Sequence, residues 1–104
     1  MNEELQKCIQ SLETEWAMPD GFLCQAREGV FDHQRGAAFL TMLEGINLSE
    51  DATIDRRLVA LLWYIPNFLR WQKERVAEKG SDTVAFEQLT NRVQRIVEEV
   101  LGVP

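Results

Sequence analysis

Carboxylates are the side chains of this sequence that could most readily do chemistry, and they concentrate in its first half. Residues 1–55 carry eleven acids and three bases, a net charge of −8, whereas residues 56–104 carry six acids and eight bases, a net of +2. The pattern Glu50-Asp51-x-x-x-Asp55 places Asp51 and Asp55 on one face of an expected helix, where they could share a cation or an arginine. A solvated helix face is the other interpretation, and no Glu-x-x-His metal motif accompanies the pair. We therefore expect no metal site and no cofactor.

Two cysteines and one histidine are the other residues with nucleophile or metal chemistry. Cys8 and Cys24 form either a redox pair or two small buried apolar residues. Together with His33 they are too few for a zinc site. A Cys24–His33 nucleophile pair would need a third group to orient it, and the sequence contains neither that signal nor a Gly-rich phosphate loop or nucleophile elbow. We expect that the chain is not an enzyme.

The second half interleaves basic and aromatic residues, a combination typical of sites for single-stranded nucleic acid. Acids such as Glu74 alternate with these bases, and the isoelectric point of about 4.7 also argues against nucleic-acid binding. Tryptophan and tyrosine favour protein interfaces as well, which makes Tyr64 and Trp71 candidate apolar contacts for a protein partner. Trp71, flanked by Arg70 and Lys73, is offset from the apolar stripe of its helix and is either exposed or part of the core.

Helices must position these residues, because apolar residues recur at helical spacing and no alternating strand pattern occurs. We expect one all-α domain over residues 1–104, a compact bundle of about five to six helices. A central apolar helix over residues 52–65 is interrupted at Pro66, which either kinks it or begins a new helix. A long C-terminal helix spans residues 82–101. Gly36 marks either close packing against another helix or a poorly formed first turn.

The sequence contains no signal for membrane insertion or for secretion. No apolar run approaches 18 residues, the length typical of a membrane-spanning helix. The first residues, Met1-Asn2-Glu3-Glu4, lack the apolar segment of a secretory signal. We expect a cytoplasmic protein without a membrane partner.

An acidic first half without catalytic motifs predicts a binding function. Such a surface repels nucleic acid and anionic membranes, and it attracts cationic proteins and speeds their association. We expect a small acidic binding protein that neutralises or escorts a cationic protein partner. Five carboxylates are expected to pair with Lys and Arg of that partner, and two aromatic residues to form the apolar centre of the contact. These residues are Asp32, Glu44, Glu50, Asp51, Asp55, Tyr64 and Trp71.

In size, charge and lack of catalytic motifs the chain resembles bacterial immunity proteins, which are small, acidic and frequently helical proteins that neutralise nuclease toxins. The resemblance is one of kind and covers no alignable segment. It implies a nuclease-type toxin as the partner, with the positive groove that holds phosphates as the surface to be masked. The alternative is a structural or regulatory helical module that forms a homodimer through excess apolar surface and has no inhibitory role.

Overall fold

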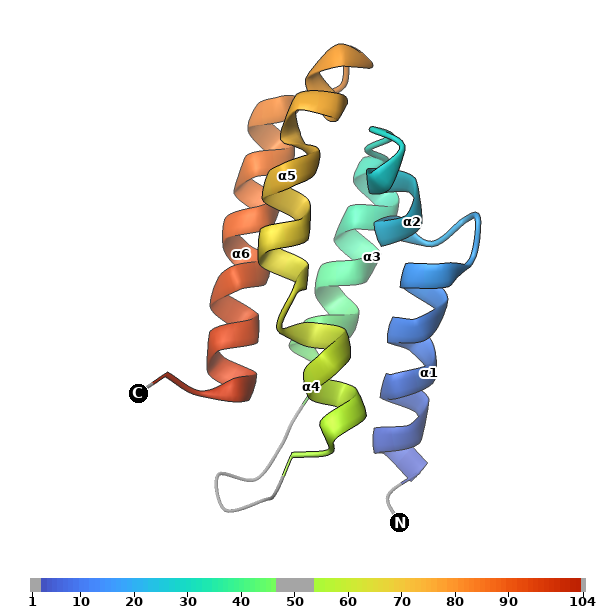
Figure 1. Cartoon of the computed structure of the whole chain (residues 1–104), viewed down its shortest axis with the longest axis vertical. Coiled ribbons are helices and arrows are strands. Elements are labelled where there is room, and N and C mark those ends of the chain that lie inside the picture. Colours follow the sequence, from blue (N-terminus) through green and yellow to red (C-terminus); the bar gives the residue numbers. More distant parts are fainter. Residues whose placement is uncertain (1–2, 47–53, 104) are drawn as a thin grey trace.

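The computed structural model describes residues 3–46 and 54–103, and within these ranges the chain is all-helical without strands (Figure 1). The elements in chain order are α1 (Glu3–Ala17), α2 (Phe22–Arg27), α3 (His33–Glu44), α4 (Arg56–Leu62), α5 (Ile65–Glu78) and α6 (Thr83–Leu101). Only α1, α3, α5 and α6 have twelve or more residues, whereas α2 and α4 have six and seven. The all-α prediction is confirmed, but five to six bundle helices is slightly too many, because four helices form the bundle.

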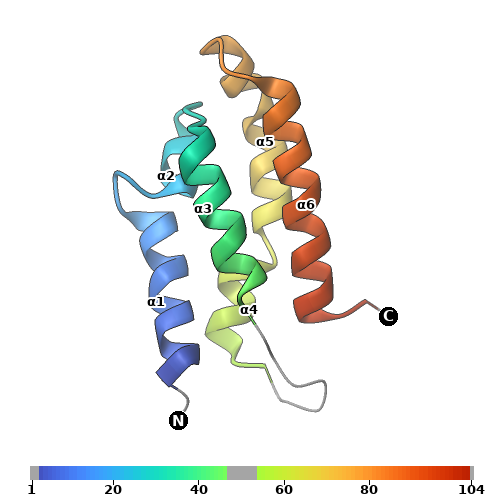
Figure 2. The same ribbon diagram turned by 180° about the vertical axis from the view of Figure 1, so that it is seen from behind.

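The short helix α4 extends the long helix α5. In Figure 1, α4 continues the line of α5, so that the two form one broken column beside α1 and α6. Seen from behind, α3 lies between α1 and α6 (Figure 2). The smallest extent of the molecule is 19 Å, about two helix diameters, so the helices form two layers. None of the described helices combines the length and the apolarity that a membrane span requires.

The starts of three helices are fixed by aspartate side chains. Asp32 accepts hydrogen bonds from the backbone N–H groups of Gln34 and Arg35, at 2.8 and 3.1 Å. Asp55 and Asp82 cap α4 and α6 in the same way. Such caps satisfy N–H groups that have no partner inside the helix. The C-terminal helix therefore begins directly after Asp82, as predicted, whereas α4 begins at Arg56, later than the expected residue 52.

The break before Pro66 is the main departure from the predicted helices. The expected helix over residues 52–65 ends at Leu62, and α5 begins at Ile65 with Pro66 in its first turn. Proline lacks an N–H, and its ring clashes with the carbonyl four residues earlier, which here belongs to Leu62. The helix must therefore end before the proline itself is reached. Trp63 and Tyr64 form the turn between α4 and α5.

One contiguous core is built from buried side chains of all six helices. The indole N–H of Trp16 donates to the carbonyl of Leu61 at 3.0 Å, which joins α1 to α4. Gly36 is buried where α3 crosses α6, and a Cβ at this position would lie 2.7 Å from Leu89 Cδ1. Close helix packing, rather than a poorly formed turn, therefore accounts for this glycine.

Gly36→Ala should lower the free energy of unfolding by about 1 kcal/mol. Alanine in a helix normally stabilises by about 1 kcal/mol relative to glycine, but overpacking a core costs about 1–3 kcal/mol. Gly45→Ala is the matched control, because its Cβ would come no closer than 3.4 Å to its neighbours. Urea denaturation followed by circular dichroism measures both variants. A Gly36→Ala protein more stable than the parent would contradict close packing of α3 on α6.

Candidate protein-docking surface

The carboxylates predicted to bind a partner do not form one cluster in the described structure. Asp32 precedes α3 and Glu44 ends it, and twelve helical residues separate them by about 18 Å. Glu44 and Asp55 lie at the same end of the bundle, on either side of the link between α3 and α4 (Figure 1). Glu50 and Asp51 belong to that link and lie outside the described residues. The three described carboxylates of the predicted set are thus divided between the two ends of the molecule: Asp32 lies at one end, and Glu44 and Asp55 lie at the other.

Each described member of this set also has a partner within the chain. Asp32 and Asp55 cap helices, and Glu44 pairs with Arg92 of α6 at 2.8 Å. A further bridge joins Glu13 of α1 to Arg57 of α4, also at 2.8 Å. Both ion pairs connect an acid of the first half with an arginine of the second, so part of the acidic excess is neutralised locally. Exposed pairs of this kind stabilise a fold by at most about 1 kcal/mol and can exchange partners.

His33, Cys8 and Cys24, the residues with nucleophile or metal chemistry, do not form a catalytic or metal-binding arrangement in the described structure. His33 Nε2 is 3.8 Å from Asp82 Oδ2, and its ring packs against Phe31. Cys8 and Cys24 are half-buried free thiols, and burial raises the pKa of Cys8. In the part of the chain that the structure describes, no three His, Cys, Asp or Glu side chains are placed to hold a metal ion. The absence of an enzymatic function stays a prediction.

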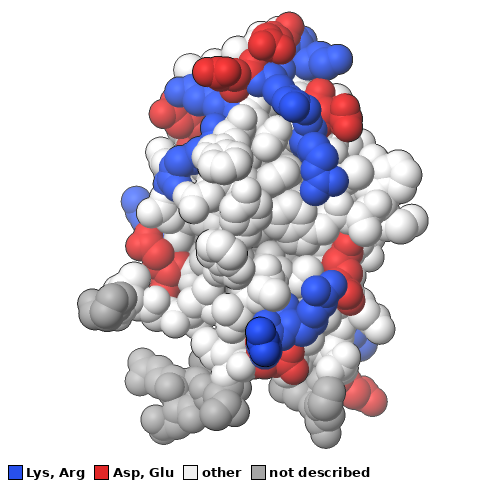
Figure 3. Space-filling view, in the orientation of Figure 1, with Lys and Arg blue, Asp and Glu red and all other residues white. Residues whose placement is uncertain are grey.

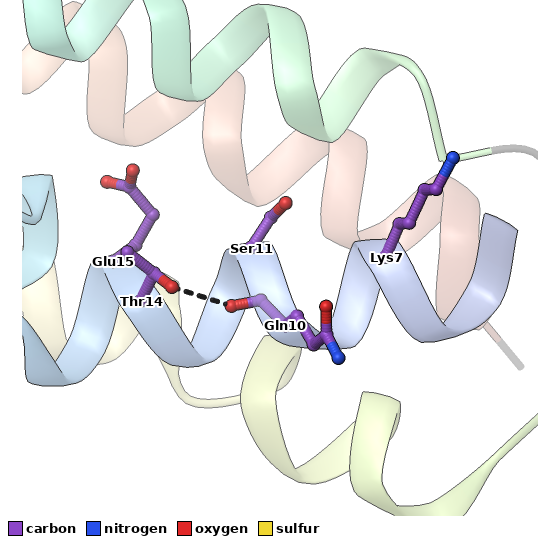
Figure 4. A pocket seen from close by; sticks show the side chains of 5 residues that line it. All are labelled: Lys7, Gln10, Ser11, Thr14 and Glu15. Atoms are coloured by element: carbon purple, nitrogen blue, oxygen red, sulfur yellow. Dashed lines mark hydrogen bonds between the residues drawn. The ribbon is translucent and has the colours of Figure 1, made fainter. Parts of the chain in front are cut away.

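A shallow hollow of about 450 Å³ lies on the outer side of α1 (Figure 4). Its lining side chains are Lys7, Gln10, Ser11, Thr14 and Glu15. The Thr14 hydroxyl donates to the carbonyl of Gln10, and the Glu15 carboxylate accepts from the N–H of Phe22 at 2.7 Å. Ligand pockets are mostly apolar and enclosed, whereas this hollow is polar, open and partly satisfied by its own helix. We assign no ligand to it.

The most distinctive surface is aromatic. Trp63 is 56% exposed and Trp71 is 74% exposed, and the half-buried Tyr64 lies between them. Ring centroids are 5.4 Å apart for Trp63 and Tyr64, and 6.4 Å apart for Tyr64 and Trp71. We call Trp63, Tyr64 and Trp71 the aromatic surface. It exists because the chain turns at Trp63 and Tyr64 before Pro66, and α5 then places Trp71 about two turns beyond Tyr64 on the same face.

Buried rings support this surface from below. Tyr64 contacts Phe68 at a centroid distance of 6.5 Å, and Phe68 packs edge-on against Trp16 at 4.8 Å. Phe68 is buried, and Trp16 is fixed by its hydrogen bond to Leu61. The aromatic surface therefore rests on side chains with little freedom to move, which reduces the entropy lost when a partner binds.

Charged residues border the aromatic surface rather than cover it. Over α4 and α5, Figure 3 shows an uncharged stretch in the centre of the view, with mixed groups of Lys, Arg, Asp and Glu above and below it. The guanidinium carbon of Arg27 lies 5.5 Å from the centroid of Phe68, and Arg75 donates to the carbonyl of Arg27 at 2.8 Å. Arg70 and Glu74 are exposed on α5 on either side of Trp71 in the sequence. An apolar centre with a polar rim is the anatomy of a protein interface.

Two of the three aromatic residues were named from the sequence as candidate contacts, and Trp63 was not. Tyr64 and Trp71 were predicted as apolar contacts, and the structure shows that Trp71 is exposed. Trp63 falls within the central apolar helix expected over residues 52–65, and a position in such a helix implies burial. The available signal was Pro66, because a proline disrupts the helix up to four residues before it and so frees Trp63 from that helix.

Comparison with protein families, curated proteins and solved structures found no match to this chain. Function must therefore be inferred from the surface itself. Its geometry offers exposed aromatic rings on a rigid base, and this arrangement suits recognition of another molecule.

Two substitutions at Asp55 separate its role as the cap of α4 from the effect of its negative charge. Asp55→Ala removes the cap of α4 and should lower the free energy of unfolding by about 1 kcal/mol. Asp55→Asn keeps a capping oxygen while removing the charge, and it should leave stability within about 0.5 kcal/mol of the parent. Urea denaturation compares the two. Equal losses in both variants would show that charge, and not capping, is what Asp55 contributes to the fold.

Proposed function

We propose that this chain is a non-catalytic protein-binding protein that docks its partner on the aromatic surface. The observation that carries the proposal is the exposure of Trp63 and Trp71 on one face, 56% and 74%. Tryptophan, tyrosine and arginine dominate the residues that contribute most to binding at protein interfaces. All three residue types meet here, with Arg27 against the buried ring beneath Tyr64.

The aromatic surface suits an interface in shape as well as in composition. The ring planes of Tyr64 and Trp71 are inclined by 80°, and those of Trp63 and Tyr64 by 55°. Rings set at such angles contact one another, and each ring offers a large apolar area that a partner can bury. Because buried Phe68 and Trp16 support these rings, a partner meets a surface that is already organised.

A finer proposal comes from the sequence: the partner is cationic, and the chain neutralises it as an immunity protein neutralises a nuclease toxin. Its support is the net charge of −6 and the acidic excess of residues 1–55. In the structure this role would fall to the end of the bundle that carries Glu44 and Asp55, because arginines border the aromatic surface. A homodimer is the competing proposal, since a second copy could also cover exposed tryptophans.

Affinity capture from cells that naturally produce the chain tests the proposal. The baits are the parent protein, the double variant Trp63→Ser/Trp71→Ser, and Val84→Ser. Val84 is the matched control, because it is 65% exposed and lies at the start of α6. Substitutions at such exposed positions should change stability by no more than about 0.5 kcal/mol, which circular dichroism checks.

At least one protein should be retained by the parent and by Val84→Ser and lost by the tryptophan double variant. A set of retained proteins that is identical for all three baits would contradict docking on the aromatic surface. The isoelectric point of the retained protein tests the finer proposal, which requires a basic partner. Sedimentation velocity of the parent and the double variant tests the homodimer, which requires a dimer that the double variant loses.

A further inference from the structure

Three arginines, Arg27, Arg70 and Arg75, lie near the aromatic surface, with the acid Glu74 beside Trp71. Arg27 lies against Phe68 on one side, with Arg75 bonded to its carbonyl. Arg70 is exposed on the side of α5 that faces α6, where it lines a cleft with Lys73 and Phe86. Arginine side chains therefore approach the aromatic surface from α2 and from the side of α5 that faces α6.

The described ion pairs leave these three arginines unneutralised. The salt bridges in the described residues engage Arg57 with Glu13, Lys73 with Glu87 and Arg92 with Glu44, and His33 with Asp82. None of them engages Arg27, Arg70 or Arg75. Glu74 is the carboxylate that stands nearest to Trp71 along the exposed face of α5, one turn away. In the described residues, the charges of these three arginines are thus not balanced by a salt bridge, although Arg75 also donates to a backbone carbonyl.

We infer that the segment of the partner that contacts the aromatic surface consists of apolar side chains flanked by carboxylates. This inference rests on the proposed protein-binding function and specifies the chemistry of the contact. Carboxylates pair with guanidinium groups through short, often bidentate hydrogen bonds, and the adjacent apolar surface strengthens such pairs by excluding water. The apolar side chains of the segment pack against the exposed rings of Trp63, Tyr64 and Trp71.

The inference concerns local charge and is compatible with a partner of either net charge. Exposed charges act over a Debye length, about 8 Å at physiological ionic strength. A basic protein can present a short acidic segment over that distance. The net charge of the partner and the charge of its contact segment are therefore independent properties, and each is measured separately.

Single-stranded nucleic acid also combines negative charge with groups that stack on tryptophan. The observations favour a peptide, because the chain has a net charge of −6 and Glu74 stands beside Trp71. Phosphates placed along α5 would meet this carboxylate, and the whole chain would repel a polyanion. The experiment below includes an oligonucleotide competitor, which would detect binding of nucleic acid.

A random peptide library displayed on phage provides the test, with the immobilised full chain as the target. The variants are Trp63→Ser/Trp71→Ser, the charge reversal Arg27→Glu/Arg70→Glu, and Arg95→Glu. Arg95 is the matched control, because it is an exposed arginine on α6. Peptides selected by the parent are synthesised, and their affinities for each variant are measured. Oligothymidylate is added as a competitor in a separate arm.

Selected peptides should combine Trp, Phe or Leu with flanking Asp and Glu. The tryptophan double variant should lose them, the charge reversal should weaken them about tenfold, equivalent to about 1.4 kcal/mol, and Arg95→Glu should leave them unchanged. Peptides that depend on the tryptophans but show no acidic bias would overturn this inference and leave the proposed function standing. No selection, or selection insensitive to the tryptophans, would overturn both. If oligothymidylate displaces the peptides and binds more tightly than they do, the surface binds nucleic acid and the inference is overturned.

Discussion

The constraint on which this structure depends is that the backbone cannot continue from α4 into α5 as one helix. Pro66 has no N–H to give to the carbonyl of Leu62, and its ring collides with that carbonyl. The column must therefore break at Trp63 and Tyr64, although the sequence there is apolar on every side. Below the break α4 packs on α1, and above it α5 packs on α6 and α2. At the break itself Trp63 faces solvent and Tyr64 is left half-buried.

The core and the aromatic surface are two parts of one aromatic array. Phe68 belongs to the core, and it touches both Trp16, which holds α1 on α4, and Tyr64, which belongs to the surface. A partner that binds Tyr64 would thus contact a ring that the buried side chain of Phe68 holds in place. The carboxylates have a different place in the fold, because Asp32 and Asp55 are used to begin helices and Glu44 to join α3 to α6. Their number in the sequence overstates the charge that remains available at any one site.

Much of the fold follows from local sequence rules, whereas the site follows from tertiary placement. The apolar stripe of α6, its cap at Asp82 and its end at Gly102 are local features, and all were predictable. The pairing of Glu44 with Arg92 depends on which helices pack together, and sequence spacing alone does not give it. Trp63 was missed for a related reason. A residue in a helix that is apolar all round is expected to be buried, but α4 ends at Leu62 and Trp63 lies beyond it. The position of that end depends on the reach of Pro66 back to Leu62.

Hydroxyl-radical footprinting of the tryptophans tests the central claim most directly, because it reports on each ring in the free chain and in a saturated complex with its captured partner. In the free chain oxidation should be fastest at Trp71, slower at Trp63 and slowest at Trp16, following their exposure. In the complex the account predicts strong protection of Trp71 and Trp63, with Trp16 unchanged. Undiminished oxidation of Trp71 in a saturated complex would contradict the account, because the partner would then bind elsewhere.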